Sequence, residues 1–138
     1  MKSDIASLLE SRITEDTRRK ITLALKQDKI KNFRILDLGC GENGSFHYGE
    51  LKVTGADKLR ERITNRASKK VIADAEKRLP FKDKEFDVVI FSGVIQYLRN
   101  AGSALNEINR ILRERGILVL TTVNRNSLLR RAGLIKRE

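Results

Sequence analysis

The chain has 138 residues, a length that suits one domain, and 40% of its residues are hydrophobic. No apolar run approaches the roughly 20 residues of a membrane span. The start Met1-Lys2-Ser3-Asp4 lacks the apolar stretch of a secretory signal, and the single cysteine, Cys40, excludes an internal disulfide. The net charge of +11 favours polyanion partners, although a merely solvated basic surface has the same composition. We therefore expect a basic, cytoplasmic protein without a transmembrane segment.

Hydrophobic periodicity predicts helices and strands that alternate along the chain. Helical patterns cover residues 3–11 and 14–28; in the second, Thr14 is a candidate N-cap, and Ile21, Ala24 and Leu25 share one face. Short apolar runs predict five strands, at 33–38, 53–56, 70–73, 86–91 and 117–123. Further helices are predicted at 58–67, at 100–113 with Gly116 as its stop, and from 126–131.

Alternating strands and helices are typical of an α/β domain with a parallel sheet. The run at 86–91 is the most apolar and is expected to be a central strand, buried on both faces. Right-handed crossovers would place a ligand at the carboxyl ends of the strands. Within this single domain of 138 residues we expect N-terminal helices at 1–31, a ligand-binding core at 33–123 and a basic tail at 124–138.

Glycines and acidic residues follow the predicted strands. The first strand ends in Asp37-Leu38-Gly39-Cys40-Gly41-Glu42-Asn43-Gly44, in which glycines permit a tight turn and close approach of a ligand. Asp57 and Asp74 follow the second and third strands, where a carboxylate can accept hydrogen bonds from ribose hydroxyls. These positions predict a site for a nucleoside-like ligand. Gly39-x-Gly41-x-x-Gly44 also matches the dinucleotide fingerprint, so a nicotinamide-dinucleotide domain is an open alternative at this point.

Four blocks together resemble the class I S-adenosylmethionine-dependent methyltransferases, in particular the type that includes the ubiquinone/menaquinone methyltransferases. They occur in the family order and cover most of residues 33–124. A dinucleotide domain would explain the glycines but not the third and fourth blocks. The blocks are ILDLGCG at 35–41, VTGAD at 53–57, DAEKRLPF at 74–81 with FDVVIFS at 86–92, and LNEINRIL at 105–112 with GILVL at 116–120.

The resemblance implies a Rossmann-like fold, S-adenosyl-L-methionine as the cofactor, and a set of cofactor-binding residues. By this resemblance, Gly39 and Gly41 border the methionine part of the cofactor, and Asp37 supports the loop or the cofactor amine. The full set implied is Asp37, Gly39, Cys40, Gly41, Asp57, Lys58, Asp74, Ala75, Ser92 and Gly93.

The remaining roles are implied in the same way. Asp57 would hold the ribose hydroxyls, and Asp74 would bond the adenine amino group. Ala75 would give a backbone contact to the adenine ring. Ser92 and Gly93, after the fourth strand, would lie near the cofactor and open toward the substrate.

The sequence departs from the family pattern in two places that affect the fold. Residues 45–51 supply at most about two helical turns, so one sheet face is thinly covered unless the N-terminal helices cover it. Only 15 residues follow Val123, whereas the family adds a hairpin of strands 6 and 7. We therefore expect five strands in the order 3-2-1-4-5, with strand 5 at an edge. A homodimer built near that edge and truncation from a longer protein are both open.

Candidate catalytic residues are few, because methyl transfer needs mainly alignment and, for weakly acidic acceptors, a general base. His47 is a candidate base, with an exposed loop histidine as the alternative. Tyr97, beside Gln96, is a candidate substrate-facing group, with core packing as the alternative. Cys40 reads as a small filler rather than a nucleophile. No Cys/His spacing indicates a metal. Ser92-Gly93-Val94-Ile95 lacks the proline motifs of DNA methyltransferases.

The function expected is transfer of a methyl group from S-adenosylmethionine to an unidentified small molecule, lipid or nucleic acid. Basic segments at 12–34 and 125–137 are candidates for polyanion contact, with a solvated surface as the alternative. A catalytically inactive cofactor-binding or nucleic-acid-binding module with this fold is the competing hypothesis.

Overall fold

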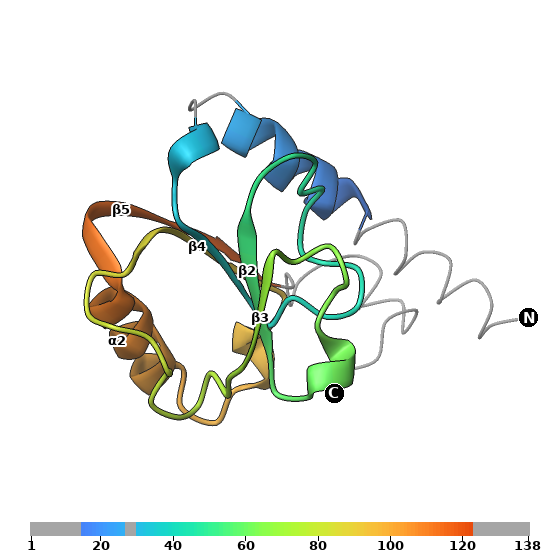
Figure 1. Ribbon diagram of the computed structural model, residues 1–138. Coiled ribbons are helices and arrows are strands. Elements are labelled where there is room, and N and C mark those ends of the chain that lie inside the picture. Colours follow the sequence, from blue (N-terminus) through green and yellow to red (C-terminus); the bar gives the residue numbers. More distant parts are fainter. Residues whose placement is uncertain (1–14, 27–29, 123–138) are drawn as a thin grey trace, which may run out of the picture.

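Five parallel strands form one sheet in the computed structural model (Figure 1), which describes residues 15–26 and 30–122. The strand order is β3-β2-β1-β4-β5, as predicted. The helices predicted at 3–11 and from 126–131, and the Thr14 cap, lie outside the described residues. The strands are β1 (Ile35–Leu38), β2 (Val53–Asp57), β3 (Lys69–Ile72), β4 (Phe86–Ser92) and β5 (Leu112–Thr121).

Two α-helices lie on opposite sides of this sheet, as Figure 1 shows. One covers residues 15–26, within the predicted 14–28, and the other is α2 (Ala101–Ile111). Three single 3-10 turns complete the described helical structure: η1 (Ile30–Asn32), η2 (Arg60–Arg62) and η3 (Ile95–Tyr97).

The two central strands are buried on both faces and divide the core into two layers. In β1 and β4, successive side chains point to opposite faces, so Leu36 and Val89 face α2 while Ile35 and Val88 face the other helix. This explains why both strands are mostly apolar in sequence, with Asp37 in β1 and Asp87 in β4 as the charged exceptions.

The face away from α2 is covered by the N-terminal helix, as one of the two alternatives predicted. Ile21 and Leu25 of this helix belong to one buried cluster with Phe46 and Tyr48 of the β1–β2 connection. Ala24, predicted on the same face, is exposed instead. That connection contains no helix. Two aromatic side chains and a helix from before β1 therefore replace the usual crossover helix.

α2 begins with a side-chain cap and packs through one stripe. The Asn100 side chain accepts a hydrogen bond from the Ser103 N–H at 3.0 Å, which satisfies one free amide of the first turn. Ala104, Ile108 and Ile111 are buried along the face toward the sheet. The predicted helix at 100–113 is therefore confirmed in position, although it ends at Ile111.

The predicted helix at 58–67 is wrong, because only the 3-10 turn η2 forms there. Residues 58–62 are all exposed, and of the apolar side chains in this stretch Leu59 is exposed while Ile63 is buried. Leu59, Ile63 and Ala67 have helical spacing, but the backbone is extended at Leu59 and Ile63, and Ile63 and Ala67 pack over Gly55 of β2 instead.

Gly116 was predicted to stop the helix at 100–113, and that prediction is also wrong, because Gly116 lies inside β5. Leu112 already pairs with Phe86, and Ile117 pairs with Val88, so the intervening residues bulge out of the ladder. A Cβ at Gly116 would come within 2.9 Å of the Arg113 carbonyl oxygen, so the bulge requires glycine. Strand pairing to β4 therefore ends the helix.

β5 forms an edge of the described sheet, as expected. Leu118 and Leu120 of β5 are exposed on the side of the sheet where α2 packs. The homodimer expected near this edge stays a prediction.

Candidate functional site

The parallel arrangement brings the carboxyl ends of β1, β2, β3 and β4 to one edge of the sheet. The chain turns sharply after β1, where the backbone N–H groups of Gly39 and Cys40 donate to the Ala56 carbonyl at 2.8 and 3.0 Å. These bonds fasten the start of the glycine loop to the end of β2. Most of the residues that sequence reasoning selected lie along this edge.

Asp57, the last residue of β2, joins the glycine loop to the end of its own strand. Its Oδ2 accepts the Gly41 N–H at 3.1 Å, and its Oδ1 accepts the Lys58 N–H at 2.8 Å. Each carboxylate oxygen has a second lone pair, so the group can also accept hydrogen bonds from a ligand.

Asp74 lies beside Asp57 at the end of the neighbouring strand. The Ala73 N–H donates to the Asp57 carbonyl at 3.0 Å, and the Lys58 ammonium lies 3.8 Å from Asp74 Oδ1. The same Oδ1 accepts the Glu76 N–H at 2.9 Å, which closes a local turn. The structure therefore brings together the predicted Asp57, Lys58 and Asp74, and the next side chain, Ala75, is buried.

Two glycines leave open space at this edge. Gly41 and Gly93 have φ angles of 63° and 68°, in the left-handed region that favours glycine. A Cβ at Gly41 would meet no atom within 4 Å, and one at Gly93 would meet only the Gln96 amide at 4.0 Å. At Gly39, by contrast, the Val94 side chain already fills that space, since an added Cβ would lie 2.6 Å from it.

Asp37 is fully buried and turned into the protein rather than toward the open edge. Its Oδ2 accepts the Ser45 N–H at 2.7 Å and the Tyr48 hydroxyl at 2.6 Å. Burial raises the pKa of this carboxyl, although both hydrogen bonds oppose the shift. Of the two roles predicted for Asp37, this geometry corresponds to support of the glycine loop.

Cys40 packs behind the loop. Its Sγ lies 3.3 Å from where a Cβ on Gly55 would stand, and burial raises the thiol pKa to about 11. A protonated, buried thiol is a poor nucleophile, which agrees with the predicted filler role.

Ser92 and Gly93 are fixed by the end of β5. The Ser92 hydroxyl lies 2.6 Å from that of Thr121, and the Gly93 N–H donates to the Thr121 carbonyl at 3.0 Å. These contacts hold the turn after β4 beside the glycine loop, where Val94 covers Gly39.

The two candidate catalytic side chains lie in different settings. His47 is partly exposed, and its Nε2 lies 2.8 Å from Glu15 Oε1 on the N-terminal helix. Tyr97 is 57% exposed in η3, so the alternative of core packing is wrong. A catalytic role for either residue stays a prediction.

Sequence reasoning missed two side chains that shape this edge. Tyr48 holds Asp37, and Val94 packs on Gly39. Tyr48 could have been found, because an aromatic residue in a crossover too short for a helix is expected to pack inward. Nothing in the sequence indicates that Val94 contacts Gly39.

Within residues 15–26 and 30–122, no group of three or more His, Cys, Asp or Glu side chains is arranged to hold a metal ion. In the same part of the chain, no helix is long and apolar enough to cross a membrane.

Comparison with known proteins matches this region to one family. A protein-family sequence model described as a methyltransferase domain matches residues 36–120, which include all four strand ends of the candidate site. MJ0638, an uncharacterized protein of Methanocaldococcus jannaschii, is 34% identical over 122 residues, covering 80% of this chain and 50% of that protein. A malonyl-[acyl-carrier protein] O-methyltransferase of Legionella pneumophila is 34% identical over 110 residues, covering 69% of this chain and 38% of that enzyme.

Solved structures agree with this match. The PH0226 protein of Pyrococcus horikoshii superimposes with a TM-score of 0.69 at 27% identity, covering 94% of this chain and 65% of that chain. A possible histamine N-methyltransferase of Thermotoga maritima, at 23% identity, shares the fold with a TM-score of 0.66, covering 95% of this chain and 64% of that chain. The chain spans half or less of the length of the two sequence relatives. With its predicted motifs, strand order and family match in agreement, the chain belongs to the class I S-adenosylmethionine-dependent methyltransferases, whose cofactor is S-adenosylmethionine.

Proposed function

We propose that this domain binds S-adenosylmethionine along the carboxyl edge of β1, β2, β3 and β4 and transfers its methyl group to an acceptor. The observation that carries the proposal is the position of Asp57. Its carboxylate shapes the glycine loop through Gly41 and lies next to Asp74 at the end of the adjacent strand. One edge thus offers two carboxylates for a nucleoside and open space at Gly41 for the rest of the ligand.

The residues present fit the cofactor. Asp57 would accept hydrogen bonds from the ribose hydroxyls, and Asp74 with the Ala75 backbone would bind adenine. Gly41 and Gly93 would allow close approach, since neither carries a side chain into the open space. When bound, S-adenosylmethionine supplies an electrophilic methyl group, so the chain's residues need to orient it and exclude water. Residues 33–123 form the cofactor-binding core in this proposal.

The test is calorimetry of the whole chain with S-adenosylmethionine, S-adenosylhomocysteine and NAD. We expect binding of both sulfur nucleosides and not of NAD. Asp57→Asn, which keeps a carbonyl for the Gly41 N–H but loses the charge, should weaken binding about tenfold. Asp16→Asn is the matched control, because Asp16 is an exposed carboxylate on the N-terminal helix. No binding of either sulfur nucleoside by the wild-type chain contradicts the proposal.

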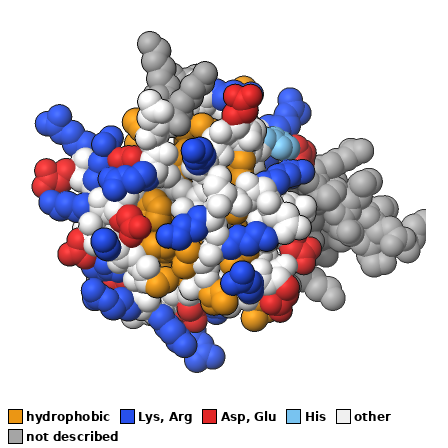
Figure 2. Space-filling model, in the orientation of Figure 1, with side chains coloured by type: hydrophobic (Ala, Val, Ile, Leu, Met, Phe, Trp, Pro, Cys, Tyr) orange, Lys and Arg blue, Asp and Glu red, His pale blue; other side chains and the backbone are white. Residues whose placement is uncertain are grey.

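For the acceptor, we infer a molecule that carries a carboxylate. Six basic side chains and one acidic one are exposed between Lys58 and Lys70, beside the Asp57–Asp74 edge, and Figure 2 shows Lys and Arg side chains over the face where β3 lies. The Legionella relative is, by its name, a malonyl-[acyl-carrier protein] O-methyltransferase. A carboxylate is ionised at neutral pH, so its methylation needs no general base, in keeping with a His47 that is bound to Glu15.

Radiolabelled S-adenosylmethionine distinguishes the acceptor classes. The chain is incubated with malonyl-[acyl-carrier protein], with total RNA and with lipid vesicles, and the label is counted in each. Base-labile label on the malonyl carrier, as expected for a methyl ester, supports a carboxylate acceptor. Label on RNA or lipid instead refutes it. Cofactor binding without transfer to any fraction favours the inactive-module alternative.

A further inference from the structure

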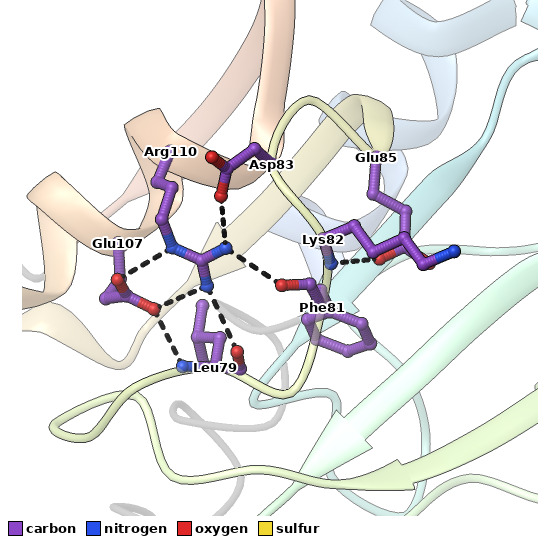
Figure 3. A network of polar contacts seen from close by, with 7 residues as sticks. All are labelled: Leu79, Phe81, Lys82, Asp83, Glu85, Glu107 and Arg110. Atoms are coloured by element: carbon purple, nitrogen blue, oxygen red, sulfur yellow. Dashed lines mark hydrogen bonds and ion pairs between the residues drawn. The ribbon is translucent and has the colours of Figure 1, made fainter.

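The loop between β3 and β4 carries Asp74 and Ala75, and side chains of α2 hold it at its middle. Glu107 Oε2 accepts the Leu79 N–H at 2.7 Å, and the Arg110 guanidinium donates to the Leu79 carbonyl at 3.1 Å. Both backbone polar groups of Leu79 are therefore bound by two residues one turn apart on the same helix. Figure 3 shows how these groups converge.

Arg110 also binds the loop beyond Leu79. One of its terminal nitrogens donates to the Phe81 carbonyl at 2.8 Å and to Asp83 Oδ1 at 2.9 Å (Figure 3). Its Nε donates to Glu107 Oε1 at 2.9 Å, so the two α2 residues also fix each other. Asp83 is 75% exposed and its ion pair is weak in water, whereas Arg110 and Glu107 are only 17% and 20% exposed.

The near end of the same loop is fixed by a turn and by packing. The Lys77 N–H donates to the Asp74 carbonyl at 3.0 Å, and Glu76 Oε2 accepts the Arg99 N–H at 3.3 Å. Ala75 and Leu79 both lie in the core cluster against α2. Since only three residues separate Ala75 from Leu79, a shift of Leu79 moves the backbone at Ala75.

We propose that Glu107 and Arg110 are positioning residues for the adenine side of the cofactor site. They act through Leu79, holding the loop so that Asp74 and the Ala75 backbone meet the ligand in one fixed arrangement. The inference rests on the proposed function, because it needs adenine to bind at Asp74 and Ala75. Glu107 and Arg110 form the Glu-x-x-Arg pair of the fourth sequence block. No contact with the cofactor explains this pair, and the inference gives it a role in binding.

The guanidinium is required because one planar group serves two carbonyls and two carboxylates at fixed angles. Arg110→Met removes all of these bonds and leaves the Leu79 and Phe81 carbonyls without this partner. Arg110→Lys keeps the charge but not the fork. Glu114→Gln is the matched control, because it removes the Lys84–Glu114 ion pair, which spans 3.1 Å between the far end of the same loop and β5.

The experiment measures calorimetric affinities of the whole chain for S-adenosylhomocysteine and for adenosine, well below each variant's melting temperature, which is determined separately. Arg110→Met is expected to lower the affinity for both ligands by the same factor, about tenfold. The factor is the same because the substitution loosens the loop that contacts adenine, which both ligands contain. Arg110→Lys should lie in between, and Glu114→Gln should bind as the wild type does.

The outcomes separate the hypotheses. If Arg110→Met melts at a lower temperature but binds both ligands with wild-type affinity while folded, the pair is merely structural and the inference is overturned. If Arg110→Met does not fold, Arg110→Lys decides: a loss for both ligands supports the inference, and unchanged affinity refutes it. If the wild-type chain binds neither ligand, the proposed function itself fails.

Discussion

Gly41 is the residue at which backbone and ligand requirements can be separated most cleanly. Its φ of 63° is costly for any other residue, but a Cβ there would meet no atom. Gly41→Ala should therefore lower the free energy of unfolding by only about 1 kcal/mol, while weakening S-adenosylhomocysteine binding at least about tenfold, because the methyl group would enter the ligand space. Calorimetry and urea unfolding measure the two effects.

Gly49→Ala is the matched control for this prediction. Gly49 has a φ of 57° and equally open surroundings, but it lies in the β1–β2 connection beyond the site. The two variants should lose similar stability, and only Gly41→Ala should lose affinity. Equal affinity in both variants would show that the ligand does not approach Gly41.

Tyr48 is predicted to matter for stability rather than for chemistry. Its hydroxyl donates at 2.6 Å to the buried Asp37, whose other oxygen has no hydrogen-bond partner among the described residues. Tyr48→Phe should reduce the free energy of unfolding by about 2 kcal/mol, because a buried carboxylate loses a donor. Tyr97→Phe, at an exposed tyrosine, should change it little in the same urea titration. A similar loss in both variants would contradict the role given to Tyr48.

At the scale of elements, the sequence correctly predicted those helices and strands that local residue patterns determine. Runs of apolar residues predicted the five strands, and the acidic residues at the ends of β2 and β3 predicted which strand ends form the candidate site. The pattern failed where a distant contact decides the structure. The pairing of Leu112 with Phe86 ends α2 early, and no local signal around Gly116 reveals it. Likewise, Leu59, Ile63 and Ala67 have the spacing of a helix, and the local sequence does not reveal that Ile63 and Ala67 pack over Gly55 of β2 instead.

Attachment of α2 to the β3–β4 loop should depend on acidity. Arg110 and the Leu79 amide hold the pKa of Glu107 at about 2, below its ordinary value of 4.5. A lowered pKa in the folded state means that the ionised carboxylate stabilises the fold above pH 4.5, and that this contribution is lost as the pH falls from 4.5 toward 2.

Urea unfolding across this pH range, for the wild type and for Glu107→Gln, tests the point. The difference in unfolding free energy between the two proteins should be constant above pH 4.5 and shrink as the pH falls toward 2. Asp37, whose pKa is raised by burial, contributes with the opposite sign, but it is present in both proteins and cancels in the difference. A difference that does not vary with pH would mean that Glu107 is not held ionised by the fold.

At the scale of the whole molecule, the charge of +11 opposes compaction. Salt screens this repulsion, so raising sodium chloride from about 20 mM to about 200 mM at neutral pH should raise Tm by a few degrees. The control is the same titration near the isoelectric point of about 10.2, where the net repulsion, and with it the effect of salt, should largely vanish. Salt also weakens ion pairs such as those of Arg110. A Tm that falls with salt at neutral pH would therefore mean that specific ion pairs outweigh the repulsion of the net charge. In that case the basic side chains near β3 would be neutralised by nearby acidic groups and would not be free to attract an anionic acceptor.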